Sequence, residues 1–171
     1  DQPKNFDIYL PCNANLLVLD YGEGFFDIIK QYIPEEELSR IVIVISEHNF
    51  KGDFHQLNNI VRYFKTYGIK IAINQLGSES HLDYIQMLAP NILKVNIEQL
   101  SYESWGAQND LFTSLSSSAR KIGANMLFEG IDTVHQLQFA WKNSGRYYQG
   151  KYLAEAGTGL IPRNQLKKSF K

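Results

Sequence analysis

The stretch GIKIAINQLG, residues 68–77, decides the fold of this chain. Its β-branched residues predict a buried strand, which ends on two side-chain amides and a second glycine. Gly68 stands where the left-handed residue that follows a helix is expected. In parallel α/β proteins the carboxyl ends of the strands carry the functional site. The stretch therefore predicts a strand that delivers Asn74 and Gln75 to such a site.

Strands and helices alternate along the rest of the chain. Residues 41–45 are five β-branched residues in a row, which is typical of a parallel strand buried on both faces. Apolar runs predict the other strands, and helical spacing of apolar residues predicts the helices between them. The expected strands are 6–10, 41–45, 69–73, 92–96, 125–129 and 146–150, and the expected helices are 25–33, 54–67, 81–88, 111–122 and 134–141.

Caps and glycines mark the helix ends. Asp53 is expected to cap one helix, Asp110 begins another, and Gly68, Gly123 and Gly145 each end a helix before a strand. The repeated order of helix, glycine and strand predicts parallel βα units. Roughly six strands are too few for a closed (β/α)₈ barrel. The spacing leaves two choices, an open doubly wound sheet or a barrel without its first units.

Composition narrows the class of protein. The 171 residues carry a net charge of −1, so we expect no nucleic-acid partner. Their hydrophobic content of 44% is ordinary, and no apolar run is long enough to span a bilayer, so we expect no membrane segment. The single cysteine, Cys12, excludes an internal disulfide and suits a reducing compartment, so we expect the cytoplasm. The chain begins without methionine, and we expect a fragment or processed piece. One domain is expected over 1–171, with a tail from about residue 157.

Polar residues follow each predicted strand. They are Asn13, Ser46, Glu47, Asn74, Gln75, Asn96, Glu129, Asp132 and Gln149. In a βα fold these side chains converge on the carboxyl edge of the sheet. Ordinary loop polarity is the alternative explanation. The four histidines have no ligand spacing, which argues against a zinc site.

Five of these stretches carry a family resemblance. Val44–Glu47 stands for Glu-Ile-Thr-Glu, Asn74–Gly77 for Asp-Asp-Phe-Gly, Lys94–Asn96 for Lys-Ile-Asp, Phe128–Asp132 for Ala-Glu-Gly-Val-Glu, and Gln149–Tyr152 for Gln-Gly-Tyr-Tyr. In this order the chain resembles EAL domains, which are (β/α)₈-barrel phosphodiesterases that open cyclic di-GMP with two divalent metals. A more specific resemblance, to the YkuI type of EAL protein from Gram-positive bacteria, is carried by residues 15–17, 47–50, 67–72, 119–124 and 145–147. The resemblance covers nearly the whole chain and implies a barrel whose first strand–helix units are missing here.

The departures from the family pattern bear on activity. Several positions that hold metal ligands in the family are neutral here, namely Pro11 (or Asn13, if the alignment slips), Val44, Asn74, Gln75 and Asn96. The remnants of the catalytic site are Lys94, Glu129, Glu47 and Asp132. Amides offer a metal an oxygen but no charge. The resemblance therefore implies a degenerate EAL domain without phosphodiesterase activity, with no metal and no cofactor.

The surviving polar residues predict a binding site. We expect Lys94, Gln149, Asn74, Gln75 and Asn96 to face a ligand, with Lys94 either touching phosphate or paired with Glu129. In the family, the residue at Glu47 braces a loop and the residue at Gln149 meets guanine or another ligand oxygen.

Three hypotheses remain open at this stage. The first is a binding module for cyclic di-GMP or for a protein partner, with a slight preference for the protein. The second is an active phosphodiesterase that uses Mg²⁺ or Mn²⁺ and releases linear pGpG. The third is a structural module. A homodimer through the aromatic residues near 102–112 fits any of the three.

Overall fold

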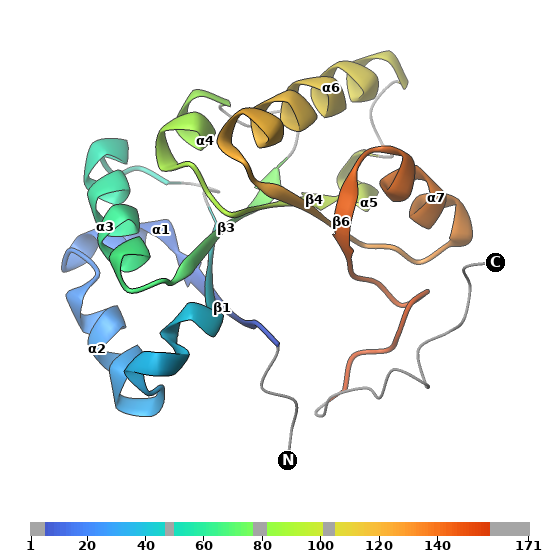
Figure 1. The fold of residues 1–171 in the computed structure, drawn as a ribbon. Helices are drawn as coiled ribbons and strands as arrows, with labels where there is room; N and C mark the ends of the chain where they lie inside the picture. Colours follow the sequence, from blue (N-terminus) through green and yellow to red (C-terminus); the bar gives the residue numbers. More distant parts are fainter. Residues whose placement is uncertain (1–5, 47–49, 77–81, 101–104, 158–171) are drawn as a thin grey trace.

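The structure is a computed structural model that describes residues 6–46, 50–76, 82–100 and 105–157. One sheet contains six strands (Figure 1): β1 (Ile8–Asn13), β2 (Ile41–Ser46), β3 (Lys70–Leu76), β4 (Ile92–Asn96), β5 (Asn125–Glu129) and β6 (Gly145–Tyr148). The helices are α1 (Ala14–Leu19), α2 (Glu23–Tyr32), α3 (Phe54–Thr66), α4 (Leu82–Leu88), α5 (Ile97–Leu100), α6 (Trp105–Ile122) and α7 (Val134–Lys142), with a 3₁₀ helix at Glu35–Arg40.

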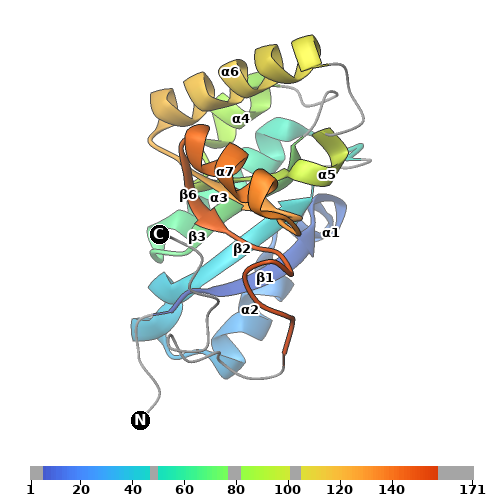
Figure 2. The same ribbon diagram turned by 90° about the vertical axis from the view of Figure 1, so that its right-hand side faces the viewer.

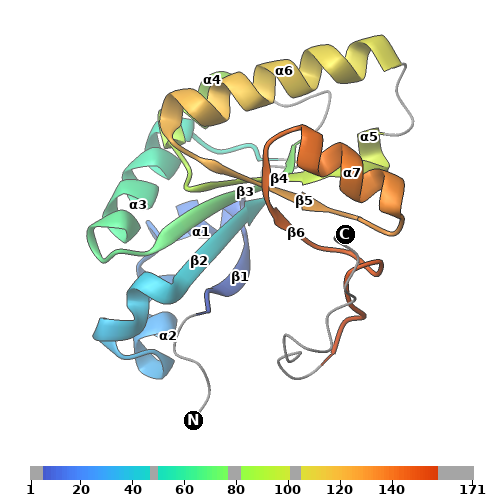
Figure 3. The same cartoon turned by 45° about the vertical axis from the view of Figure 1, so that its right-hand side comes forward.

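The order of the strands resolves the choice left by the sequence. The sheet runs β1-β2-β3-β4-β5-β6, and every neighbouring pair is parallel. A doubly wound sheet reverses its strand order at a switch point, and this sheet does not. The sheet curves, and α3, α4, α6 and α7 follow one another around its outer side (Figure 3). The fold is therefore part of a (β/α) barrel.

Alternation along the strands separates two apolar layers. On β2, Ile41, Ile43 and Ile45 belong to the large core between the sheet and the helices. Val42 and Val44 point to the other face, where they pack with Ala72, Ile92 and Leu127 and are joined by Tyr9. Both sets are buried, which explains the unbroken run of β-branched residues in β2. The second set is the inner face of the curved sheet.

Aromatic rings join α2 to α3 in the outer layer. The rings of Phe26 and Phe64 lie 5.7 Å apart, and both side chains are fully buried. Gly22, just before α2, has φ +76°, and a Cβ there would lie 2.8 Å from Ile60. The buried face of α2 carries Phe26 and Ile29, whereas Ile28, one of the apolar residues whose helical spacing predicts the helix over 25–33, is exposed.

The first strand differs from the prediction. It was expected over 6–10 with Pro11 as its end, but β1 continues through Pro11 to Asn13. Within the described residues β1 pairs only with β2, so it is an edge strand. An edge strand tolerates proline because the missing N–H need not face a neighbour. The inner-face alternation therefore runs on to Asn13.

Two helix boundaries also differ. The α6 helix begins at Trp105 rather than at Asp110, so the segment predicted to be irregular is partly helical. Gly145 opens β6, and Ser144 with φ 64° takes the left-handed position predicted for the glycine. Gly68 and Gly123 have the predicted positive φ values, +77° and +71°. Among the described helices, none is both long and apolar enough to cross a membrane.

We predict that Ile43→Ala lowers the free energy of unfolding by about 2–5 kcal/mol, because Ile43 is fully buried in a core that cannot close the cavity. Ile28→Ala is the matched control, since that side chain is 57% exposed and its loss should change stability by less than about 0.5 kcal/mol. Urea unfolding of the two variants measures the difference. Equal effects would show that the core assignment is wrong.

Candidate functional site

A pocket of about 620 Å³ opens on the inner face of the sheet, toward the carboxyl ends of the strands. Parallel strands bring these ends to one edge, and alternation turns every second side chain inward. The described residues that line it are Tyr9, Pro11, Cys12, Asn13, Val44, Ser46, Asn74, Lys94, Leu127, Tyr148 and Gln149. Among them is one cation and no carboxylate.

An ion pair forms the charged centre beside this pocket. The Nζ atom of Lys94 on β4 lies 2.9 Å from the Oε2 atom of Glu129 on β5. Their side chains are 13% and 17% exposed, so water screens the pair only in part. The pairing expected for Lys94 is present. An ammonium has three N–H donors, and among the described residues Glu129 is the partner of Lys94, so Lys94 retains capacity to bind a further acceptor at the pocket.

Two predicted ligand-binding residues line the same pocket. Asn74 ends the inner-face alternation of β3, and its Oδ1 atom is buried without a hydrogen-bond partner in the described part of the chain. Gln149 lies just after β6, where its backbone N–H donates to Phe128 O over 2.8 Å. An unpaired buried acceptor costs free energy that a ligand donor would recover. The site is thus suited to N–H or O–H groups near Asn74.

Other predicted residues lie elsewhere. The Oδ1 atom of Asn96 accepts from the backbone N–H of Glu98 over 2.9 Å at the start of α5. Asp132 is exposed, and its Oδ1 atom accepts from the N–H of Lys151 over 3.2 Å. Neither side chain lines the pocket. Glu47 and the side chain of Gln75 fall outside the described part of the structure, as do Ser80, the expected cap of the helix over 81–88, and Tyr102 of the aromatic region near 102–112.

The sequence analysis missed the pocket walls formed by Tyr9 and Tyr148, because it considered only the residues that follow the strands. Tyr148 donates its O–H to Gly145 O over 2.6 Å. Burial raises the pKa of Tyr9 and of Tyr148, and it raises the pKa of the Cys12 thiol to about 11. All three side chains are therefore neutral at neutral pH, and the charge of the lining comes from Lys94.

These features define a class of protein, an α/β barrel fold with a binding pocket at the carboxyl ends of its strands. Comparison with known sequences identifies the family. Residues 6–156 match the EAL domain, and the chain belongs to the EAL domain family.

Individual relatives agree with this assignment. The chain is 45% identical over 168 residues to the uncharacterized EAL-domain containing protein YkuI of Bacillus subtilis, covering 96% of this chain and 41% of that protein. The crystal structure of B. subtilis YkuI in complex with substrate c-di-GMP and calcium matches with TM-score 0.88 and 42% identity over 98% of this chain and 41% of that chain. An EAL domain protein from Listeria monocytogenes has the same fold, with TM-score 0.73 and 19% identity, over 88% and 60% of the two chains. This chain thus spans about 41% of the length of YkuI.

The donor groups of the pocket do not fit the two-metal centre implied by the family. Two adjacent cations need several anionic oxygens. In the part of the chain that the structure describes, no three His, Cys, Asp or Glu side chains cluster in a way that could hold a metal ion. Glu129 is moreover engaged by Lys94.

We predict that Cys12 reacts slowly with iodoacetamide in the folded protein. With a pKa of about 11, roughly one thiol in a thousand is ionised at pH 8, against about a quarter for a free cysteine with pKa about 8.5. Mass spectrometry should show alkylation at least about a hundredfold slower in buffer than in urea. Because Cys12 is the one cysteine of the sequence, the signal is unambiguous. Similar rates in the two conditions would contradict the burial of this thiol.

Proposed function

We propose that this EAL domain binds cyclic di-GMP and does not hydrolyse it. One observation carries the proposal. Its pocket offers the partly buried cation Lys94, while no carboxylate lines it among the described residues. Such a lining favours an anionic ligand through the N–H groups of Lys94 that Glu129 does not use, and it offers a catalytic metal few ligand atoms. The structure of YkuI with c-di-GMP, a relative of 42% identity, supports this choice of ligand.

The binding chemistry follows from the residues on the inner face. The Lys94 ammonium would meet a phosphate of the ligand as a point charge, using donors that Glu129 does not occupy. Asn74 supplies an unpaired carbonyl oxygen for an N–H or O–H of the guanine or ribose. Gln149 offers both a donor and an acceptor at the end of β6. The aromatic walls Tyr9 and Tyr148 give flat surfaces for a base.

Absence of hydrolysis follows from the same residues. Metal-assisted attack on a phosphodiester requires a water that a cation has made acidic, and carboxylates hold that cation. Here Val44 and Asn74 stand in the pocket at positions where the family motifs carry acids. An amide oxygen brings no charge, and an aliphatic side chain brings no ligand atom.

We predict binding of cyclic di-GMP without turnover. Calorimetric titration should give saturable heat both with and without Mg²⁺ or Mn²⁺, because Lys94 rather than a metal holds the phosphate. Chromatography after overnight incubation should recover the intact nucleotide. Appearance of linear pGpG would establish the active phosphodiesterase instead. The absence of any binding would leave a module that acts through protein contacts or structure alone.

We predict that Lys94→Ala weakens cyclic di-GMP binding by about tenfold or more, as expected for the loss of a charge-assisted contact. Lys70→Ala is the matched control, because Lys70 on β3 also forms an ion pair, with Asp7 at 2.7 Å, but does not line the pocket. Glu129→Gln retains the Lys94 ammonium and releases it from its ion pair, so the affinity of this variant for cyclic di-GMP should rise several-fold. Circular dichroism checks that each variant is folded. An equal loss of cyclic di-GMP affinity in Lys94→Ala and Lys70→Ala would show that Lys94 does not contact the ligand.

A further inference from the structure

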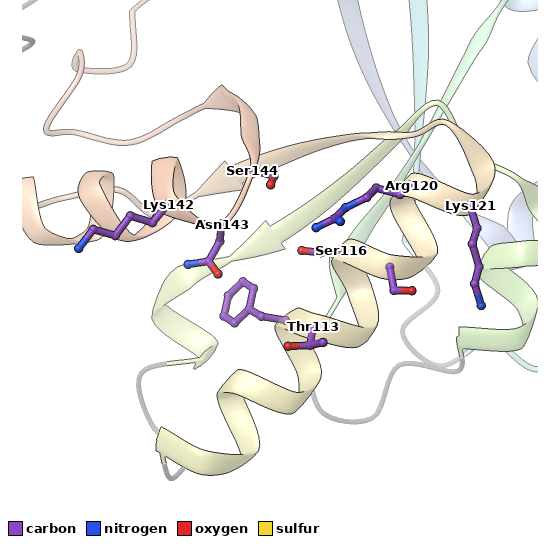
Figure 4. A pocket seen from close by; sticks show the side chains of 9 residues that line it. Thr113, Ser116, Arg120, Lys121, Lys142, Asn143 and Ser144 are labelled. Atoms are coloured by element: carbon purple, nitrogen blue, oxygen red, sulfur yellow. The ribbon is translucent and has the colours of Figure 1, made fainter.

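A second pocket, of about 510 Å³, lies between the ends of α6 and α7 (Figure 4). These helices lie side by side (Figure 2), and each ends where the next strand begins. The pocket is therefore near the amino ends of β5 and β6, whereas the Lys94 pocket is at the carboxyl ends. Its lining residues are Phe112, Thr113, Ser116, Ser117, Arg120, Lys121, Lys142, Asn143 and Ser144. We propose that this second pocket binds a small anion with two linked phosphate groups.

Charge is the first argument. The lining includes Arg120, Lys121 and Lys142 and no Asp or Glu. Within the described residues none of these three cations forms an ion pair, in contrast to Arg40 and Lys94, which have carboxylates at 2.6 and 2.9 Å. Three uncompensated positive charges around one hollow create a potential that favours a multiply charged anion.

The direction of the side chains is the second argument. Arg120 extends across the pocket toward Ser116 and Ser144, while Lys121 and Lys142 point outward on either side (Figure 4). A guanidinium presents a planar fork of N–H donors that matches two oxygens of one phosphate. Lys121 and Lys142 lie at the rim, and their flexible side chains would have to turn inward to meet a second phosphate.

Neutral groups complete the lining. Ser117 and Ser144 make no side-chain hydrogen bond within the described part of the chain, so their hydroxyls are free to donate. The Nδ2 group of Asn143 already donates to Phe139 O over 2.8 Å. Phe112 closes the floor against Phe139, with ring centroids 4.8 Å apart. The pocket thus offers hydroxyl donors for phosphate oxygens, and the ring of Phe112 forms its floor.

Helix ends explain only part of this arrangement. Cations in the last turn of a helix offset its negative end, which accounts for Arg120 and Lys121 on α6 and for Lys142 on α7. This helix-end effect does not explain why cations from two helices line the same pocket without a carboxylate. Some carbonyls in the last turns of the two helices are also satisfied, since Ala119 O accepts from Ala124 N over 2.9 Å and Phe139 O from Asn143 N over 3.1 Å. They therefore repel an anion less than free carbonyls would.

The test uses inorganic pyrophosphate as the probe and the intact protein. Calorimetry should show saturable binding in the micromolar to millimolar range. Hydrogen–deuterium exchange should show protection of peptides covering residues 112–121 and 142–145, and Arg120→Ala should weaken binding by about tenfold or more. The matched control is Arg62→Ala, which removes an exposed arginine on α3, outside the pocket, and should bind as the parent does.

Two further arms separate the alternatives. Citrate has comparable charge but no phosphate, and equal binding of citrate would overturn the assignment to phosphate chemistry. Lys94→Ala should bind pyrophosphate normally, so loss of cyclic di-GMP binding and loss of pyrophosphate binding are distinguishable. Absence of heat at millimolar pyrophosphate, protection elsewhere, or equal weakening by Arg120→Ala and Arg62→Ala would each overturn the proposal.

Discussion

Lys94 and Glu129 face each other on a surface that is otherwise mostly apolar, and this contact organises the inner side of the sheet. A charge in that position needs a counter-charge, because desolvation would otherwise be too costly. The partner must come from a neighbouring strand, within reach of the long lysine side chain. The parallel register supplies it, since Asn96 is opposite Glu129 and Lys94 lies one inward position earlier on β4. Strand pairing and the alternation of side chains therefore together determine where the charged groups beside the pocket lie.

The sequence predicted most of this frame. The β-branched runs at 41–45 and 69–73 lie in β2 and β3, because burial on both faces leaves few residue types that fit. Predictions were less accurate where local chemistry allows two outcomes. Pro11 reads as a strand end, but β1 passes through it, with Pro11 in register with Val44 of β2. Ser144 takes a left-handed conformation that the sequence assigned to Gly145.

The site was predictable to a similar degree. Lys94, Asn74 and Gln149 were expected at the carboxyl edge, and all three line the pocket. Asn96 was placed there too, but its side chain is used to begin α5, a local hydrogen bond that competes with any ligand. The pocket beside Arg120 was not foreseen. Its residues come from the ends of two helices, and no strand pattern or motif brings such positions together before the fold is known.

The edges of the sheet have a consequence for solution behaviour. Within the described residues, β1 and β6 each pair on one side only, and edges of this kind can recruit strands from other molecules. Pro11 interrupts the row of N–H donors near the middle of β1, so a strand added from another copy would form a broken ladder. The other edge, β6, is four residues long and carries the exposed Arg146. Where these edges stay unpaired, the short charged edge and the proline-interrupted edge both hinder the addition of a strand from another copy.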